Sequence, residues 1–286
     1  MIENPPKHFV IFHHPKVKES LGLAEEIAAF IKKQGAVAEY SSIDDEAKRA
    51  SASEADMLIA LGGDGTMLRV GRLGAFNSQP VLGINLGRLG FLMDVQPQGW
   101  PGVMRRLLCG EYRLEERLML HVAHCQNGVT LRAYEILNEL AISRGAVVRP
   151  IRLQTAVDET PLTTYVADGL IAATPTGSTA YALAVGGPIL APEVKSILLV
   201  PIAPHLCMDR ALILPPETVV EVTIRTDHQA LFSADGQRST PLQDQDVLRV
   251  RASEHVARFV RMTPPTDFYK TLADRMVKNP TADKAK

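Results

Sequence analysis

The chain has 286 residues, 46% of them hydrophobic, which is enough for one large domain or two ordinary domains with buried cores. Its 31 Lys and Arg residues nearly balance its 32 Asp and Glu residues, and a net charge of −1 argues against a nucleic-acid-binding protein. The N-terminus has neither a basic start nor a long apolar stretch, and the three cysteines are scattered. We therefore expect a cytoplasmic protein with no signal peptide, disulfide framework or zinc site.

The longest uncharged run, residues 169–192, raises the question of a membrane segment. It contains three prolines together with several glycines and hydroxyl residues, so it cannot form a lipid-facing helix. We expect no association with a membrane.

The first hundred residues alternate short apolar runs with helical patterns. A helix is predicted from the spacing of apolar residues over 21–31, and Gly35 is expected to end it. Apolar runs predict strands at residues 8–12, 36–40, 57–61 and 81–84. Strands that are apolar throughout and alternate with helices predict a parallel sheet covered on both faces, in an α/β domain over residues 1–100.

A period of two residues replaces this pattern from about residue 117, and the change falls near residues 97–116. Alternating strands are predicted at residues 118–122, 131–136, 151–154, 220–224, 247–250 and 256–260. Many half-buried strands with few helices predict a second, β-rich domain over residues 101–262. Residues 278–286 are expected to form a disordered tail.

A glycine-rich turn is the sharpest local feature of the chain. Gly62-Gly63-Asp64-Gly65-Thr66 directly follows an apolar strand and precedes a helical pattern. Such a turn brings backbone N–H groups close to a ligand, and the helix N-terminus favours an anion such as phosphate. A carboxylate beside phosphate is repulsive unless a metal ion or a proton transfer needs it, so Asp64 indicates chemistry. The alternative is that Asp64 only caps the helix.

Other phosphate-binding motifs are absent from the sequence. Neither G-x-x-x-x-G-K-[ST] nor G-x-G-x-x-G occurs, which argues against a P-loop NTPase and an ordinary dinucleotide-dependent dehydrogenase.

Two further polar clusters are candidate binding segments. Thr174-Pro175-Thr176-Gly177-Ser178-Thr179-Ala180-Tyr181 lies within the uncharged run, shortly after Asp168-Gly169. Its hydroxyls could contact a ligand, or Ser178 or Thr176 could simply cap a short helix. The pair Asn138-Glu139 follows an apolar strand and, taken alone, also suits a turn.

In this order the motifs resemble those of the bacterial NAD kinases, over about residues 8–262. The resemblance rests on Gly62 to Thr66, Gly83 to Leu92, Asn138-Glu139, Asp168 to Ile171, Thr174 to Tyr181 and Gly186-Gly187-Pro188. It implies a Rossmann-like α/β N-terminal domain and an all-β, β-sandwich-like C-terminal domain, with the active site between them. Residues 263–286 would return to the first domain.

The resemblance also implies a reaction, the transfer of a phosphoryl group from ATP or polyphosphate to the 2′-hydroxyl of the NAD adenosine ribose, giving NADP. A divalent ion, Mg²⁺, would accompany the donor, and no metal ligand is assigned to the protein itself. The family usually forms homodimers or homotetramers.

The matching positions imply roles for individual residues. Asp64 would be the general base, because a ribose hydroxyl is a poor nucleophile while it keeps its proton. Substrate contacts are implied for Asp64, Gly65, Arg69, Asn138, Glu139, Arg149, Asp168, Thr179, Ala180, Tyr181, Ala182, Leu183, Ala184, Ala203 and Gln237.

Two positions depart from the family pattern. Val166 stands where some relatives have a basic residue, so a phosphate contact is missing or replaced. The stretch Cys207 to Arg210 is richer in serine in relatives.

Two alternatives stay open at this point. The first is a kinase with the same glycine-rich turn that acts on a lipid or sugar, and the second is a dinucleotide-binding sensor without turnover.

Overall fold

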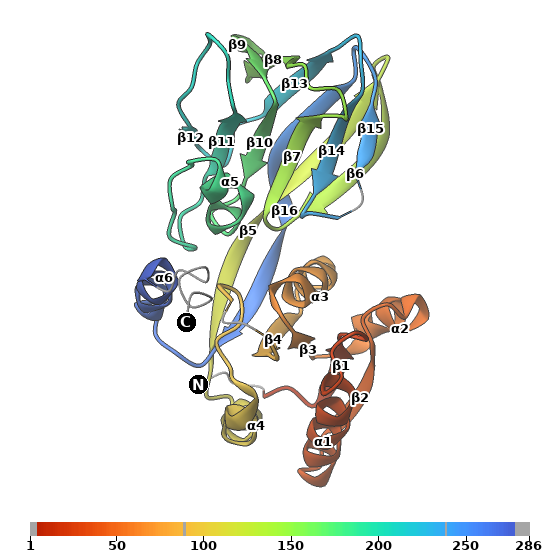
Figure 1. Cartoon of the computed structure of the whole chain (residues 1–286). Helices are drawn as coiled ribbons and strands as arrows, with labels where there is room; N and C mark the ends of the chain where they lie inside the picture. Colours follow the sequence, from red (N-terminus) through yellow and green to blue (C-terminus); the bar gives the residue numbers. More distant parts are fainter. Residues whose placement is uncertain (1–4, 88–89, 238, 278–286) are drawn as a thin grey trace. The chain divides into compact units, whose positions relative to one another are not determined.

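The computed structural model describes residues 5–87, 90–237 and 239–277, so the expected tail at residues 278–286 lies outside the described residues. The chain divides into two compact units. Unit 1 contains the residues up to Glu115 and those from Arg258 onward, and unit 2 runs from Glu116 to Ala257. Two long strands, β5 (Arg113–Gln126) and β16 (Val247–Arg261), each have residues in both units, as can be followed in Figure 1.

Unit 1 is the predicted α/β domain. Its strands run parallel in the order β2-β1-β3-β4, and Arg258 and Phe259 of β16 pair beside β4. The elements are β1 (His8–His13), α1 (Ser20–Lys33), β2 (Val37–Ser42), α2 (Glu46–Ser51), β3 (Met57–Gly62), α3 (Asp64–Phe76), β4 (Pro80–Asn85), α4 (Trp100–Leu108) and α6 (Asp267–Val277), with 3₁₀ turns at Ala52–Glu54 and Pro97–Gly99.

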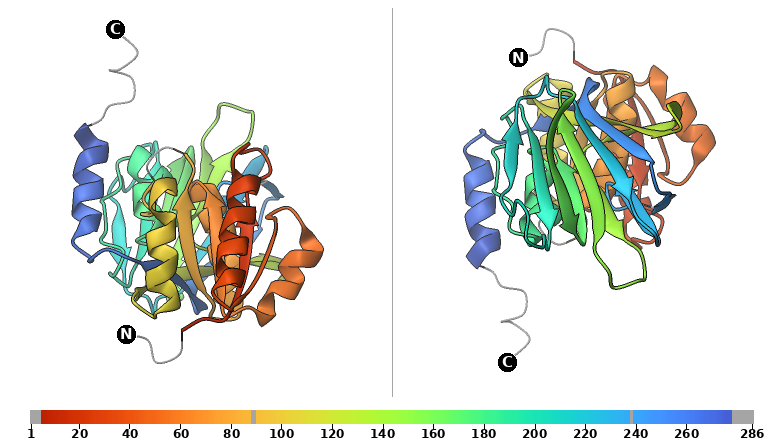
Figure 2. Two further views of the ribbon diagram at one scale, coloured as in Figure 1. Left: turned by 90° about the horizontal axis from the view of Figure 1, so that it is seen from below. Right: turned by 90° about the horizontal axis from the view of Figure 1, so that it is seen from above.

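The two faces of this sheet are covered by different helices. Alternate residues of β1 and β3, such as Ile11 and Ile59, pack with buried side chains of α1 and α4. The left view of Figure 2 shows these two helices in red and yellow. On the opposite face, Gly74 of α3 lies so close to Leu58 and Val81 that a Cβ would contact both side chains. Because both faces are buried, β3 has no exposed residue.

Helices that leave neighbouring parallel strands toward opposite faces create a crevice at the carboxyl ends of those strands. Here β1 leads to α1 and β3 leads to α3, and the order β2-β1-β3-β4 makes the β1/β3 boundary the switch point. The turn at Gly63 follows β3 at this edge. The topology alone therefore marks the glycine-rich turn as a ligand-binding position.

Unit 2 is the predicted all-β domain and consists of two sheets. One has the order β12-β11-β10-β7-β14-β15, and the other includes β16-β13-β8-β9 with the β5–β6 hairpin. Its further elements are β6 (Val129–Ile136), β7 (Glu139–Arg144), β8 (Ile151–Val157), β9 (Thr160–Ala167), β10 (Gly169–Ala173), α5 (Tyr181–Ala184), β11 (Ile197–Ile202), β12 (Leu212–Leu214), β13 (Val220–Arg225), β14 (Ala230–Ala234) and β15 (Thr240–Leu242), with a 3₁₀ turn at Gly177–Thr179.

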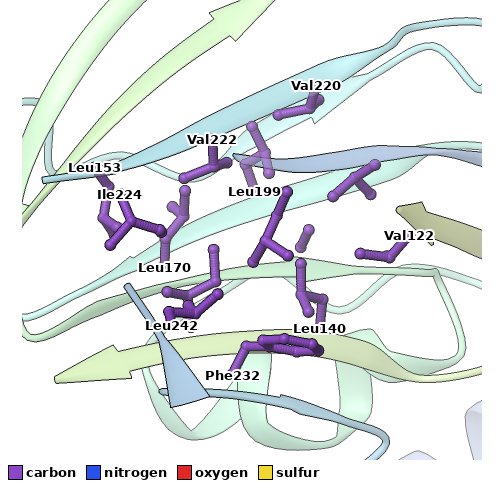
Figure 3. Close-up of a cluster of buried hydrophobic side chains, with 14 of the residues drawn as sticks. Val122, Leu140, Leu153, Leu170, Leu199, Val220, Val222, Ile224, Phe232 and Leu242 are labelled. Carbon is purple, nitrogen blue, oxygen red and sulfur yellow. The ribbon is translucent and has the colours of Figure 1, made fainter. Parts of the chain in front are cut away.

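One hydrophobic core joins these two sheets. Leu153, Val222 and Ile224 from one sheet and Leu170 and Phe232 from the other belong to one buried cluster (Figure 3). Alternation along β13 explains this arrangement, because its Val220, Val222 and Ile224 are buried while the residues between them are partly exposed.

The uncharged run forms a buried strand, β10, followed by a segment that packs against one face of that strand. All five residues of β10 are buried. Leu170 and Ala172 face the core between the sheets, whereas Ile171 and Ala173 pack on the other side against Ala182 of α5. A strand buried on both faces leaves no position for a charge. Among the described residues, no helix is both long and apolar enough to span a membrane.

The strands predicted at residues 247–250 and 256–260 both form, as parts of one continuous strand, β16. Residues 252–255 between them interrupt the apolar alternation, but they are exposed or partly exposed positions of the same extended strand. Side-chain patterning reports burial, and a strand can lose its buried face without ending.

Truncating a core leucine tests the sandwich core. Leu170→Ala is expected to lower the free energy of unfolding by about 2–5 kcal/mol, because it leaves a cavity at a side chain that is 1% exposed. The measurement is a shift of the urea unfolding midpoint. Leu131→Ala on β6, where the side chain is 55% exposed, is the control and should shift the midpoint little. Equal shifts for the two variants would contradict the placement of the core.

Candidate active site

The glycine-rich turn places Asp64 as the first residue of α3. Gly63 is the N-cap and has extended backbone, and no side chain caps the helix. The backbone N–H groups of Thr66 and Met67 donate to the Gly63 carbonyl. Gly62 has no space for a side chain, because a Cβ there would lie 2.3 Å from Thr66 Oγ1. The interpretation of Asp64 as a helix cap is therefore wrong.

The Asp64 carboxylate is held by a different part of the chain. The N–H of Phe91 donates to Oδ2 (2.9 Å) and the N–H of Leu92 donates to Oδ1 (3.2 Å). Gly90 lies against the same carboxylate, and a Cβ there would fall 1.8 Å from Oδ1. The segment Gly90-Phe91-Leu92 thus fixes both oxygens and leaves each one a further lone pair for a ligand proton.

Two other predicted residues of unit 1 are placed on the same helix. Gly65 is exposed in the first turn of α3. Arg69 donates to Asp44 Oδ1 (2.7 Å) and to the Ile43 carbonyl (3.1 Å), and its side chain is 30% exposed. Arg69 therefore holds the loop after β2.

Three segments of unit 2 meet around Asn138 and Glu139. The N–H groups of residues 137, 138 and 139 donate to the carboxylate of Asp235, at 3.0, 2.6 and 3.2 Å. Asp235 has a positive φ of 50° in the turn after β14, and its own N–H returns to the Glu139 carbonyl. From the other side, Thr174 donates from Oγ1 to the Leu137 carbonyl (2.6 Å).

The close contact of these segments depends on Gly177. A Cβ at Gly177 would lie 2.2 Å from the Asn138 carbonyl oxygen. The Gly177 N–H donates to Thr174 Oγ1 (3.1 Å), so Thr174 makes the capping bond that the sequence assigned to Ser178 or Thr176. Ser178 Oγ instead donates to the Pro175 carbonyl and accepts from the Leu190 N–H. These bonds bring Asn138, Glu139 and residues 174–178 together.

Two buried oxygens of this cluster have no partner within the described residues: Asn138 Oδ1 and Glu139 Oε2. Glu139 is 7% exposed. Burial, and to a lesser degree the negative charge of Asp235, raise the pKa of Glu139 to about 7. A buried polar atom without a partner is costly, so these two oxygens are candidates for hydrogen bonds to a ligand or a water.

Asp168 lies at the other end of the β7–β10 ladder. Its Oδ1 accepts from Arg144 Nε (2.8 Å), and its carbonyl accepts from the Arg144 N–H. Ala173 pairs with Glu139 while Gly169 pairs with Ser143. Glu139 and Arg144 are thus about 17 Å apart along β7 at ~3.4 Å per residue. Asp168 therefore lies at the opposite end of these strands from Asn138 and Glu139.

The other predicted residues of unit 2 are spread over three places. Thr179 and Ala180 are partly exposed and lead into α5, where Tyr181 is 44% exposed, Ala182 is buried, Leu183 is partly exposed and Ala184 is exposed. Ala203 follows β11 with a positive φ of 46°. Gln237 is exposed in the turn that contains Asp235.

Arg149 is the residue that fits a binding site least well. Its side chain is 64% exposed and pairs with Asp227 at 3.5 Å, which is a surface interaction.

Sequence reasoning did not assign roles to three residues that organise these clusters. Asp235 precedes a glycine and could have been identified as a turn residue. Arg144 occupies the end of a strand and Arg117 donates to Thr176 Oγ1 (3.1 Å), but neither has a local sequence signal. Among the residues described by the structure, no group of three His, Cys, Asp or Glu side chains could hold a metal ion.

Comparisons with known proteins agree with this architecture. Residues 9–112 match the family model of the ATP-NAD kinase N-terminal domain, and residues 137–262 match that of the ATP-NAD kinase C-terminal domain. A curated relative from Chloroflexus aurantiacus, "NAD kinase", is 36% identical over 268 residues, which are 93% of this chain and 97% of the relative. Another "NAD kinase", from Heliobacterium modesticaldum, is 40% identical over 222 residues, or 77% and 78% of the two chains.

Two solved structures share the fold. A yeast NADH kinase complexed with NADH has a TM-score of 0.81 at 23% identity, covering 97% of this chain and 89% of its own. An NAD kinase from Archaeoglobus fulgidus complexed with ATP has a TM-score of 0.75 at 24% identity, covering 93% and 98%.

The two family models together match most of the sequence, and curated relatives at 36–40% identity are aligned over more than three quarters of it, so the chain belongs to the NAD kinase family.

Proposed function

We propose that this protein phosphorylates the 2′-hydroxyl of the NAD adenosine ribose with ATP, or with polyphosphate, and that Asp64 is the general base. NAD kinase activity follows from the family. The observation that supports Asp64 is a carboxylate at a glycine-rich turn that neither caps its helix nor pairs with a described cation.

The proposed step balances in atoms and charge. Asp64 accepts the proton of the ribose hydroxyl while the hydroxyl oxygen forms a bond to the γ-phosphorus of ATP. The bond between that phosphorus and the bridging oxygen breaks, and ADP leaves with the electron pair. The two backbone N–H groups on Asp64 orient the carboxylate without supplying a competing positive charge.

Mg²⁺ is proposed to enter with ATP as part of the substrate. This ion prefers phosphate oxygens and water to a dedicated protein cage. Bound there, it would spread the charge that develops on the transferred phosphoryl group.

Asn138, Glu139 and Asp168 are proposed to bind NAD. The unpartnered Asn138 Oδ1 and Glu139 Oε2 support hydrogen bonds to a polar ligand at one end of β7. Asp168 at the other end would contact a different part of an extended molecule. The segment from Thr179 to Ala184 is proposed to line the adenine and ribose pocket, where exposed Tyr181 offers a flat face. Contacts from Gly65, Arg69, Arg149, Ala203 and Gln237 remain proposals from the family resemblance.

The domain roles, cellular location and assembly remain proposals too. Residues 1–100 would supply the glycine-rich turn and residues 101–262 the NAD contacts, in a cytoplasmic homodimer or homotetramer. Light scattering of the purified protein would determine its oligomeric state.

Replacing the proposed base tests the reaction. Purified protein incubated with NAD, ATP and Mg²⁺ is expected to form NADP, and Asp64→Asn should lower kcat by about 10² to 10⁴ while NAD binding changes little, because only the proton acceptor is lost. NAD binding by the unmodified protein without NADP formation from ATP or polyphosphate would favour the sensor. Phosphorylation of a lipid or sugar in place of NAD would favour the other kinase. An unchanged rate in D64N would remove Asp64 from the role of base.

The contact between Gly90 and Asp64 gives an independent test. Gly90→Ala should lower kcat about as far as D64N does, because a Cβ 1.8 Å from Oδ1 forces the carboxylate away from its position. Gly87→Ala is the matched control, since among the described residues a Cβ there would meet only Asn85 Oδ1, at 3.8 Å. Similar rates for the two variants would contradict the proposed geometry.

The buried carboxyl group of Glu139, which is proposed to bind NAD, should lower the free energy of unfolding when it is ionised. Its pKa is raised from 4.5 to about 7, so the folded chain binds a proton that the unfolded chain releases between these values. The free energy of unfolding therefore falls as the pH rises from about 4.5 to 7, by up to about 1.4 kcal/mol per pH unit, and stays lowered above that window.

Glu139→Gln removes this titration. The variant should be stabilised relative to the unmodified protein more at pH 8 than at pH 5 in thermal unfolding, and should bind NAD about tenfold more weakly by calorimetry. Glu135→Gln, a partly buried control whose carboxylate contacts His121, should leave NAD binding unchanged. A stability difference independent of pH would show that Glu139 is not protonated in this range.

A further inference from the structure

Leu92 is held at both of its backbone groups. Its N–H donates to Asp64 Oδ1 (3.2 Å), and its carbonyl accepts from Nη1 of Arg261 (2.8 Å). Arg261 is the last residue of β16 and is 169 positions away in sequence. A residue fixed on both sides cannot rotate without breaking one of these bonds, so the guanidinium restrains the segment that orients the Asp64 carboxylate.

Arg261 is itself rigidly held. Its side chain is 7% exposed, and its Nε donates to Glu115 Oε1 (3.0 Å) on β5, whose side chain is 6% exposed. Asp94 Oδ1 lies 3.5 Å from Arg261 Nη1, and Asp94 Oδ2 accepts from Thr263 Oγ1 (3.2 Å). The planar fork of an arginine donates to a carboxylate and a carbonyl from two different nitrogens in a fixed geometry, whereas a lysine carries all its donors on one nitrogen. All of these residues belong to unit 1.

We propose that Arg261 is a positioning residue of the phosphoryl transfer, acting through the Leu92 carbonyl on the hydrogen bonds that orient Asp64. This inference rests on the proposed role of Asp64 as the base. In this role Arg261 acts on the reaction only through Leu92. Its effect is to keep the base within reach of the ribose hydroxyl, where a displacement of about 1 Å costs on the order of 10²-fold in rate.

The alternative is that the Arg261–Glu115 ion pair only stabilises the fold by joining β5 and β16. Two variants separate these roles. Glu115→Gln removes the negative charge but keeps an acceptor for Nε and leaves the bond from Arg261 to Leu92. The double variant Arg261→Met with Glu115→Gln removes the donor to Leu92 in the same Glu115→Gln background, so the two variants differ only at Arg261.

The expected result is a split between kcat and KM. E115Q should keep kcat within about threefold of the unmodified protein, whereas R261M with E115Q should lower kcat by about 10- to 100-fold with the KM for NAD within about twofold. Rates are expressed per folded protein, from the circular dichroism of each sample. The same R261M and E115Q changes in the D64N protein should alter the residual rate by less than about twofold, because the group that they position is already lost.

Three outcomes overturn the proposal: kcat per folded protein close to that of E115Q, an equal factor lost with and without D64N, or a rise in KM without a fall in kcat. If the double variant does not fold, Arg261→Lys replaces it. A lysine keeps the positive charge but lacks the planar fork, because all its donors lie on one nitrogen. We therefore expect kcat to fall again while the KM for NAD is preserved. An unchanged kcat would contradict the role of Arg261.

An inactive D64N protein with a fully active Arg261 variant overturns only the inference. A fully active D64N protein overturns the base itself.

Discussion

The position of one carboxylate depends on three distant parts of unit 1. Asp64 stands at the start of α3, directly after the buried strand β3, and its two oxygens accept N–H groups from Phe91 and Leu92. Leu92 is in turn held by Arg261, far along the chain. The proposed role of Asp64 as a base requires a fixed distance and angle, and both the parallel sheet that positions β3 and the strand β16 that carries Arg261 contribute to this placement.

Unit 2 meets a different constraint, which is to hold polar atoms in a buried position at one end of β7. The Asp235 carboxylate accepts the N–H groups of three successive residues, and Thr174 and Gly177 contact the same segment from the other side. This scaffold leaves Asn138 Oδ1 and Glu139 Oε2 buried and without a partner among the described residues. Burial also raises the pKa of Glu139, so its proposed binding role is associated with a loss of stability near neutral pH.

The lack of charge and the many glycine and hydroxyl residues in the run 169–192 have two different structural causes. Its first part is β10, whose residues alternate between the core of the sandwich and the packing beneath α5. Its second part folds back over that strand and keeps Gly177 against the backbone of Asn138. The absence of charge comes from burial on both faces, while the glycines and hydroxyls come from the close backbone contacts around the candidate binding segment.

The sequence by itself determined the two fold classes, the glycine-rich turn and the family, because periodicity and local motifs are properties of neighbouring residues. Only the tertiary structure decided that Asp64 does not cap α3, that Thr174 replaces Ser178 in the capping bond, and that residues 247–261 form one strand. Nor could the sequence show that Arg144 holds Asp168 or that Arg261 holds Leu92. These bonds join residues far apart in the chain, and the sequence pattern around an arginine does not specify which distant acceptor it meets.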